Sequence, residues 1–460
     1  MATLASATPT RPAHAARTLV LLEAPVLATL LRLAGPNVLV MLAQASTGLI
    51  EAVFVGRLGT DALAGMALVF PGVMLMQMMS GGAMGGGIAP AVARALGGGR
   101  RADADALVLH ALAINGALGL AFTALGLLGG PALYRFMGGA GPALDAALQY
   151  SGVIFGGAVL VWIMNALASC VRGTGNMLVP AVVICGGALV LIPLSPCLIF
   201  GWGPFPALGV RGGGVALLLY YVGGAAVLLW YLAGGRALVR LRVARLRAGP
   251  LWDILRVGLV ASMVSVQTQL VVTAATAFVG HFGTGAIAGY GAGSRLEYLL
   301  VPLVFGLGAP LVALVGTNIG AGQRARALRV AWVGAGVAFA LTEAIGLAAA
   351  AWPGAWLGLF GRDPDMLAAG AAYLRATGPF YGFFGLGMAL YFASQGAGRL
   401  AWPLAAAVLR MAIAVGGGWL ALHWAGSLHL VFLALGAGLA AMGLVNALSV
   451  AGGAWFKGRA

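Results

Sequence analysis

The stretch Ser46-Thr-Gly-Leu-Ile-Glu-Ala-Val-Phe-Val-Gly-Arg-Leu-Gly-Thr60 holds a carboxylate, Glu51, near the end of an apolar run and then closes in a glycine-rich turn. The run covers residues 33–55, and Glu51 is its only formally charged member. About 20 apolar residues are enough to cross a bilayer, so the run predicts a transmembrane helix. A carboxylate in hydrocarbon costs about 2.5 kcal/mol or more, and such residues usually face a cavity and often handle ions or protons. We therefore predict a functional Glu51, with a hydrogen-bonded structural glutamic acid as the alternative.

The same pattern returns in the second half of the chain. Phe54-Val-Gly-Arg-Leu-Gly-Thr-Asp-Ala-Leu-Ala-Gly65 and Phe278-Val-Gly-His-Phe-Gly-Thr-Gly-Ala-Ile-Ala-Gly289 are identical at eight of twelve positions, at an offset of 224 residues. Leu96-Gly-Gly-Gly99 matches Ile319-Gly-Ala-Gly322, and Arg172-Gly-Thr-Gly175 matches Gln395-Gly-Ala-Gly398, both at an offset of 223. The chain is therefore a duplication. Homologous halves are common in secondary transporters, where they pack as lobes around a site near the bilayer midplane.

Composition excludes a soluble domain. The chain is 61% hydrophobic and 8% charged, whereas soluble domains carry about 25% charged residues. Its 75 glycines suit membrane helices that approach closely. The net charge of +15 sits in short loops between apolar runs, so we predict no nucleic-acid partner and no cleavable signal peptide. The three cysteines, Cys170, Cys185 and Cys197, lack metal-binding spacing and are interpreted as packing residues.

Hydropathy predicts an all-α polytopic membrane protein with twelve transmembrane helices in two homologous six-helix lobes. The spans are 33–55, 62–93, 106–130, 144–170, 177–201, 208–234, 253–280, 285–318, 328–352, 367–394, 402–424 and 428–455. Because each lobe has an even number of spans, the lobes run in the same direction about a pseudo-two-fold axis along the membrane normal. The predicted parts are a cytoplasmic segment (1–32), the N-lobe (33–234), a basic linker (235–252), the C-lobe (253–456) and a cytoplasmic tail (457–460).

Arginines set the predicted orientation. Loops after even-numbered spans hold fourteen arginines, and loops after odd-numbered spans hold six. The positive-inside rule then places the even loops and both termini in the cytoplasm, as in a multi-pass protein of the cell inner membrane. The linker carries Arg236, Arg240, Arg242, Arg245 and Arg247. It can lie on anionic lipid headgroups, with a solvated connector as the alternative.

Two further carboxylates fall within spans, Glu297 and Glu343, and both are candidates for a second functional acid. Glu297 follows Arg295 and can instead pair locally, whereas Glu343 has no evident partner in the sequence. The repeat equivalent of Glu51 is Ala275. The two halves are therefore predicted to be alike in structure and unequal in chemistry.

Uncharged residues complete the candidate site. Gln267, Gln269 and Met78 are candidates for the substrate cavity, because polar groups and pliable thioethers suit a pocket that accepts several shapes. Such residues also tie helices together or pack, which is the alternative. Pro36 lies fifteen residues before Glu51 and can bend the first span where a gate would flex.

At this point the sequence resembles the multidrug and toxic compound extrusion (MATE) family, nearly from end to end. The resemblance is carried by Glu51-Ala-Val-Phe-Val-Gly-Arg-Leu-Gly-Thr60, Arg94-Ala-Leu-Gly-Gly-Gly-Arg100, Asn165-Ala-Leu-Ala-Ser-Cys-Val-Arg-Gly-Thr-Gly175 and Gly316-Thr-Asn-Ile-Gly-Ala-Gly322. It implies an antiporter, not an enzyme, that exports amphipathic, often cationic compounds by rocking two lobes. Glu51 matches the family's acid in span 1, Asn165 matches an asparagine in span 4, and Gln44 and Pro36 match the DinF-like branch.

Departures from the family pattern bear on the coupling ion. Where many relatives have Asn-x-x-x-Asp in span 5, this chain has Leu191-Ile-Pro-Leu-Ser195, and the acids that NorM-like members carry in spans 7 and 10 are replaced by Gln267, Gln269 and Gln395. Sodium wants several oxygen ligands, whereas a proton needs one group. Burial raises the pKa of a carboxyl group, so we predict proton coupling through Glu51, Gln44 and Asn165.

Alternatives remain within transport. They are a sodium-coupled drug antiporter and a flippase for a lipid-linked saccharide, which would need several basic residues in its cavity. An intramembrane enzyme would need clustered His or Asp residues, and the histidines are scattered. No cofactor beyond the coupling ion is predicted. The partners are drug-like small molecules and membrane lipid, and the duplication makes a monomer sufficient.

Overall fold

The computed structural model describes residues 13–242 and 245–456. Its α-helices are α1 (Ala13–Glu23), α2 (Val26–Gly56), α3 (Thr60–Gln77), α4 (Gly85–Gly97), α5 (Arg101–Phe136), α6 (Gly141–Gly156), α7 (Ala158–Gly173), α8 (Leu178–Phe200), α9 (Val210–Ala233), α10 (Ala248–Gly280), α11 (Thr284–Gly320), α12 (Arg324–Ala351), α13 (Pro353–Leu357), α14 (Pro364–Thr377), α15 (Tyr381–Ala397), α16 (Ala401–Met411), α17 (Gly417–Leu420) and α18 (Leu428–Ala451). Each of the twelve predicted spans coincides with one helix or with helices joined at a break, so the predicted fold class is confirmed.

Span boundaries and breaks refine this prediction. The first span begins at Val26 rather than at residue 33, and the separate helix α1 precedes it. Within the described residues, ten helices are long and apolar enough to cross a membrane, or eleven when the pair α6 and α7, bent by 45°, counts as one. The remaining span consists of α14 and α15, joined by a 3₁₀ turn at Gly378–Phe380. Pro379 lies in that turn, and proline lacks the N–H that would continue an α-helix.

The duplication is visible in the backbone as well as in the sequence. Gly59 and Gly283, which precede the second span of each half, have φ angles of 125° and 100°. Gly99 and Gly322, after the same span, have φ angles of 70° and 76°. Residues with side chains rarely adopt these positive angles. Both halves therefore make the same turns, and they make them with glycine.

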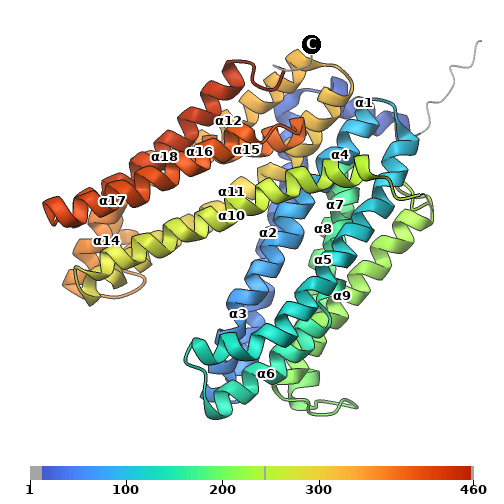
Figure 1. Cartoon of the computed structure of the whole chain (residues 1–460). Helices are drawn as coiled ribbons and strands as arrows, with labels where there is room; N and C mark the ends of the chain where they lie inside the picture. Colours follow the sequence, from blue (N-terminus) through green and yellow to red (C-terminus); the bar gives the residue numbers. More distant parts are fainter. Residues whose placement is uncertain (1–12, 243–244, 457–460) are drawn as a thin grey trace, which may run out of the picture.

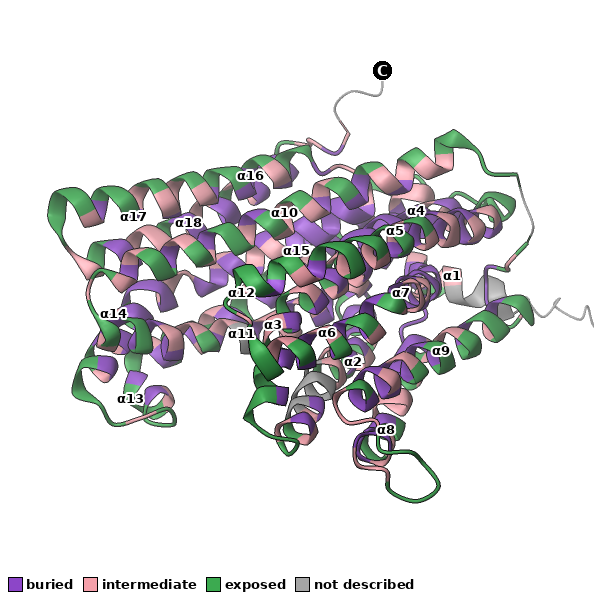
Figure 2. Cartoon of the chain, turned by 60° about the horizontal axis from the view of Figure 1, so that its bottom comes forward, coloured by how far each residue is buried: buried purple, intermediate pink, exposed green. Residues whose placement is uncertain are grey.

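The two lobes meet at one end of the molecule and diverge toward the other (Figure 1). The end where they meet holds α1 and the end of α18, and we call it the closed end. Buried residues face neighbouring helices, while exposed residues cover the outer faces (Figure 2). Many of these exposed residues are large and apolar, such as Leu128, which is 82% exposed. An apolar outer surface of this kind fits contact with lipid.

Glycines bring the lobes into backbone contact at the closed end. A Cβ atom on Gly97 would lie 2.0 Å from the carbonyl oxygen of Thr317, and one on Gly320 would lie 2.2 Å from that of Arg94. Arg94 and Thr317 are repeat equivalents, as are Gly97 and Gly320, each pair 223 residues apart. The pseudo-two-fold axis therefore passes between the ends of α4 and α11.

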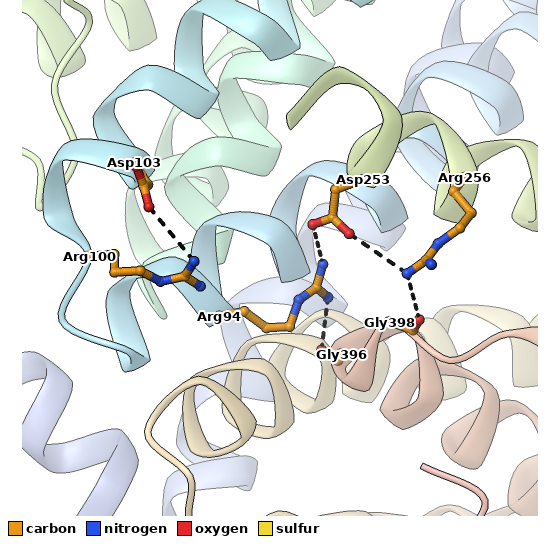
Figure 3. Close-up of polar contacts among 7 residues, drawn as sticks. All are labelled: Arg94, Arg100, Asp103, Asp253, Arg256, Gly396 and Gly398. Atoms are coloured by element: carbon orange, nitrogen blue, oxygen red, sulfur yellow. Dashed lines mark hydrogen bonds and ion pairs between the residues drawn. The ribbon is translucent and has the colours of Figure 1, made fainter. Parts of the chain in front are cut away.

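An ion-pair cluster reinforces the closed end (Figure 3). Arg94 of α4 donates to the Asp253 carboxylate of α10 at 2.7 Å and to the carbonyl oxygen of Gly396 at 3.1 Å, so it joins the N-lobe to two segments of the C-lobe. Arg256 lies 3.8 Å from the same carboxylate and donates to Gly398. The Asp253 side chain is 41% exposed. The Arg94–Asp253 ion pair therefore contributes about 1 kcal/mol or less to the free energy of unfolding.

Candidate functional site

A cavity of about 360 Å³ lies between the lobes. Methionine and phenylalanine side chains from both lobes form its apolar wall: Met41, Met66, Phe70, Met74, Met78, Phe305 and Phe392. Polar side chains cluster mainly on the N-lobe side: Asn37, Gln44, Glu51, Gln77, Tyr150, Asn165, Ser169, Arg172, Tyr220 and Tyr221, with Gln395 from the C-lobe. A mostly apolar pocket with a few convergent polar groups is the usual form of a small-molecule site.

Glu51 is buried in the N-lobe at the edge of this cavity, with only 5% of its surface exposed. Tyr150 of α6 is a hydrogen-bond partner of its carboxylate. Its Oε1 atom has no hydrogen-bond partner in the described structure and faces Gly213 of α9, where a Cβ would lie 3.0 Å away. None of the ion pairs within residues 13–242 and 245–456 involves Glu51. The acid is thus held by a phenol, without a neighbouring cation.

A chain of hydrogen bonds follows the N-lobe wall between Tyr221 and Arg172. Gln77 donates to the Tyr221 hydroxyl. Asn165 donates to Gln77 at 3.4 Å and to Ser80 at 2.9 Å. One turn further along α7, Ser169 donates to the backbone carbonyl of Asn165 at 2.8 Å and accepts from Arg172 at 3.0 Å. The wall therefore carries polar groups as far as Ser169 and Arg172, and we call the part of the cavity that these two residues line the cavity floor.

A π-helical segment, Met78–Met84, places α3 and α4 against this wall. It is rich in small residues, and a Cβ on Gly81 would lie 3.5 Å from the Asn165 side chain. At the start of α4, a Cβ on Gly85 would lie 2.7 Å from Ser169 Oγ. Glycine at these positions lets α7 approach closely enough for Asn165 to reach Ser80. Such π-helical interruptions occur frequently at functional sites.

Prolines shape the contact between α2 and α11. Pro310 has no N–H, so the carbonyl of Gly306, four residues earlier, loses its helical partner. Asn37 of α2 donates to that carbonyl at 3.1 Å and also to the carbonyl of Phe305. Pro36 lies one residue before Asn37, within α2. The proline that we predicted to bend the first span is therefore next to a direct bond between the lobes.

The other uncharged candidates lie in different places. Gln44, Asn165 and Met78 are cavity-lining residues. Gln267 is buried in α10, and neither its amide nitrogen nor its oxygen has a hydrogen-bond partner among the described residues. Gln269 is exposed on the same helix. Neither glutamine belongs to the residues that line this cavity.

Glu343 and Glu297 both make contacts inside the C-lobe. Glu343 accepts a hydrogen bond from the backbone N–H of Gly382 at 2.7 Å, in the first turn of α15. Such a contact satisfies an amide that has no partner within its helix. Glu297 accepts from the Tyr373 hydroxyl at 2.5 Å, and the buried Arg410 lies within electrostatic range of its carboxylate.

Replacement of Tyr373 by phenylalanine is expected to destabilise the protein by about 1–3 kcal/mol, because the Glu297 carboxylate loses a hydrogen-bond donor in a buried setting. Thermal unfolding in detergent measures the effect. Thr273→Val is the control, since its hydroxyl is exposed and bonds only within its own helix. Equal unfolding temperatures for the Tyr373 variant and the wild type would contradict a structural role for the pair.

Sequence reasoning did not identify Tyr150, Tyr221 or Arg172 as site residues. The repeat contained a usable signal for one of them, because Tyr150 and Tyr373 are equivalent at an offset of 223 and each bonds a carboxylate. The carboxylates come from different helices, since Glu51 lies on α2 and Glu297 on α11. Because the two acids are not at equivalent positions of the repeat, a search for acids that recur in both halves could not have related Glu51 to Glu297.

Comparison with known families agrees with this architecture. The family model MatE matches residues 36–197 and 261–420, one segment in each lobe. The chain therefore belongs to the MatE family of multidrug and toxic compound extrusion transporters. Proteins of this family are transporters rather than enzymes.

Individual relatives agree with the assignment. A FAD transporter from Shewanella oneidensis is 27% identical over 80% of this chain and 81% of its own length. A probable multidrug resistance protein, NorM, from Deinococcus radiodurans is 31% identical over 70% of this chain and 71% of its own. Among solved structures, MATE in the bent conformation has a TM-score of 0.88 at 24% identity, covering 96% of this chain and 98% of that one. A MOP superfamily transporter from Pyrococcus furiosus has a TM-score of 0.86 at 23% identity, with coverages of 96% and 99%. At these identities the structures show a shared fold.

Proposed function

We propose that this protein is a secondary antiporter that exports amphipathic, often cationic organic compounds in exchange for protons, with Glu51 as the proton-binding group. One observation carries the proposal. Glu51 is a buried carboxylate at the edge of the inter-lobe cavity, with one oxygen unbonded and no ion-pair partner among the described residues. A permanent counter-ion would hold such a group in one charge state. Without one, the acid is suited to gain and lose a proton during a transport cycle.

The surroundings of Glu51 favour a proton over sodium as the coupling ion. Sodium coordination calls for several oxygen ligands, as for other hard cations. Among the described residues, the Tyr150 hydroxyl bonds this carboxylate, Gly213 lies against it and Tyr221 is within electrostatic range, which is fewer oxygen ligands than sodium calls for. In the fifth span, Ser195 is buried and its hydroxyl has no hydrogen-bond partner in the described part of the chain, and Leu191 stands one turn before it. Sodium-coupled drug antiport is the alternative.

The proposed cycle alternates between two arrangements of the lobes. The arginine distribution places the termini in the cytoplasm of a cell with the protein in its inner membrane. On this placement the closed end is cytoplasmic. The arrangement described here then opens away from the cytoplasm. Binding of a proton to Glu51 would favour release of substrate and rearrangement of α2 around Pro36 and Asn37. This helix contacts α11 directly, so a change in its bend would be transmitted to the C-lobe.

The substrate range rests on the cavity and on the relatives. A flexible methionine-rich wall accepts varied shapes, and the relatives are named for multidrug resistance or FAD transport, which supports a small organic substrate. Arg172 is the basic residue among those that line the cavity, which makes a flippase for a lipid-linked pyrophosphate the weaker alternative. Membership of the DinF-like rather than the NorM-like branch remains a proposal based on Gln44 and Pro36.

Efflux from liposomes tests the coupling ion. Purified protein is reconstituted, ethidium is loaded, and either a pH gradient or a sodium gradient is imposed. The proposal expects efflux with the pH gradient at constant sodium, and the background rate with sodium alone. Efflux with sodium at constant pH would support the alternative coupling ion, and absence of efflux under both gradients would contradict drug antiport.

A further inference from the structure

Arg172 is the cation of the cavity floor, and the proposed drug–proton exchange does not use it. It lies in the last turn of α7 and lines the cavity together with Ser169. Its Nη2 atom donates to Ser169 Oγ at 3.0 Å. No ion pair within the described residues involves it. A guanidinium offers five N–H donors in a planar fork, so donors remain for a group in the cavity.

The repeat supplies a second donor from the other lobe. Gln395 occupies the equivalent position in the C-lobe, 223 residues later, and also lines the cavity. Its amide nitrogen donates to Tyr391 at 2.8 Å, and an amide nitrogen carries two N–H groups. Arg172 and Gln395 therefore line the same cavity from the two lobes, and each carries N–H donors.

Glycines on α4 leave room beside Gln395 and beside Ser169, the residue that Arg172 bonds. A Cβ on Gly86 would lie 2.7 Å from the Gln395 amide nitrogen, and one on Gly85 would lie 2.7 Å from Ser169 Oγ. Both glycines line the cavity. Any larger residue would cover the floor and displace the polar groups. The sequence thus preserves access to a floor that carries a positive charge.

We propose that Arg172, with Gln395, binds the phosphate of a phosphate monoester that also carries an aromatic ring system. The ring system lies against the methionine and phenylalanine side chains of the cavity wall. A phosphate has the fork geometry that arginine matches with two parallel hydrogen bonds, and its third oxygen can accept from Gln395. Glu51 lies on the N-lobe wall, apart from this floor, so the exchanged proton and the phosphate use different groups. The inference deepens the proposed function, because it rests on the cavity being the substrate site.

Paired ligands test the inference on the full-length protein in detergent. Flavin mononucleotide and riboflavin share a ring system and differ by the phosphate, and ethidium serves as the cationic ligand. Binding is followed by ligand fluorescence for the wild type, Arg172→Gln, Arg172→Lys and Gln395→Leu. The control is Arg135→Gln, which changes an exposed arginine at the end of α5.

The wild type is expected to bind flavin mononucleotide about tenfold or more tightly than riboflavin, the scale of a charge-assisted hydrogen bond. Arg172→Gln should remove that preference by lowering the affinity for flavin mononucleotide to about that for riboflavin. Arg172→Lys, which keeps the charge and loses the fork, and Gln395→Leu should each reduce the preference in part. Arg135→Gln should behave as the wild type.

Three results would overturn the inference. Equal affinity of the wild type for both flavins would do so while ethidium transport, and hence the proposed function, still stands. Equal weakening of all three ligands by Arg172→Gln, with a lowered unfolding temperature, would show that the arginine only supports the fold. Failure of the wild type to bind any of the three ligands would remove both the inference and the drug-transport proposal.

Discussion

Replacement of Glu51 by glutamine is expected to reduce pH-driven ethidium efflux from liposomes to the rate of protein-free liposomes. Glutamine keeps the length of the side chain and an oxygen that can accept from Tyr150, but it cannot bind and release a proton. The cavity wall is otherwise unchanged. Because glutamine is neutral like protonated Glu51, the form proposed to favour release of substrate, ethidium affinity in detergent should fall rather than rise.

Glu343→Gln supplies the matched control. This carboxylate also lies within a predicted span, and it accepts one hydrogen bond from Gly382. A glutamine oxygen can accept the same bond, so efflux should continue at the wild-type rate. If the Glu51 variant still concentrates ethidium under a pH gradient, proton coupling resides elsewhere. If both variants fail, unfolding temperatures separate the causes: lowered values would mean loss of fold, and unchanged values would mean that Glu343 also takes part in coupling.

Valine at Gly97 or Gly320 is expected to prevent closure of the lobes at the end that holds α1. Added Cβ atoms there would lie 2.0 Å and 2.2 Å from backbone carbonyl oxygens of the other lobe. Backbone cannot move aside as a flexible side chain does, so the arrangement described above becomes strained. Each 1.4 kcal/mol of strain shifts the population of the two arrangements about tenfold. Strain of two or three times this amount would leave the protein in the opposite arrangement and stop transport.

Distances between spin labels measure this shift. Labels on cysteines introduced at Arg57 and Arg362, both exposed between spans away from the closed end, report the separation of the lobes, after replacement of Cys170, Cys185 and Cys197. The label distance should shorten in both glycine variants. Gly129→Val is the control, because a Cβ there meets nothing within 4 Å. An unchanged distance in the Gly97 and Gly320 variants would mean that closure does not depend on these contacts.

Much of the fold was readable from the sequence, because membrane spans are set by one-dimensional hydropathy and the repeat fixed the relation of the halves. The exceptions have local causes. Helix α1 is too short and too mixed to register as a span. The break between α14 and α15 depends on Pro379 within an otherwise apolar run. The bend between α6 and α7 occurs at Gly157, in a sequence with many other glycines.

The site was readable only in part. Glu51 stood out because a lone carboxylate in an apolar run is costly to place in a membrane, and such a residue is visible in the sequence alone. Tyr150, Tyr221 and Gln77 carry no charge, and what gives them a role is contact between α3, α6 and α9, which are distant in sequence. Arg172 looked like a loop residue, because it stands at the end of its span. The structure turns its side chain into the cavity.

The glycines that seal the closed end and the residues that line the cavity are different sets. Gly97, Gly320 and the two carbonyls they approach belong to the backbone of α4 and α11, and none of them lies among the lining residues. This backbone contact requires glycine at both positions. The side chains that line the cavity are then free to diverge without altering this contact. A closed end built in this way is compatible with cavities of different chemistry, and the relatives of this chain are named for multidrug resistance and for FAD transport.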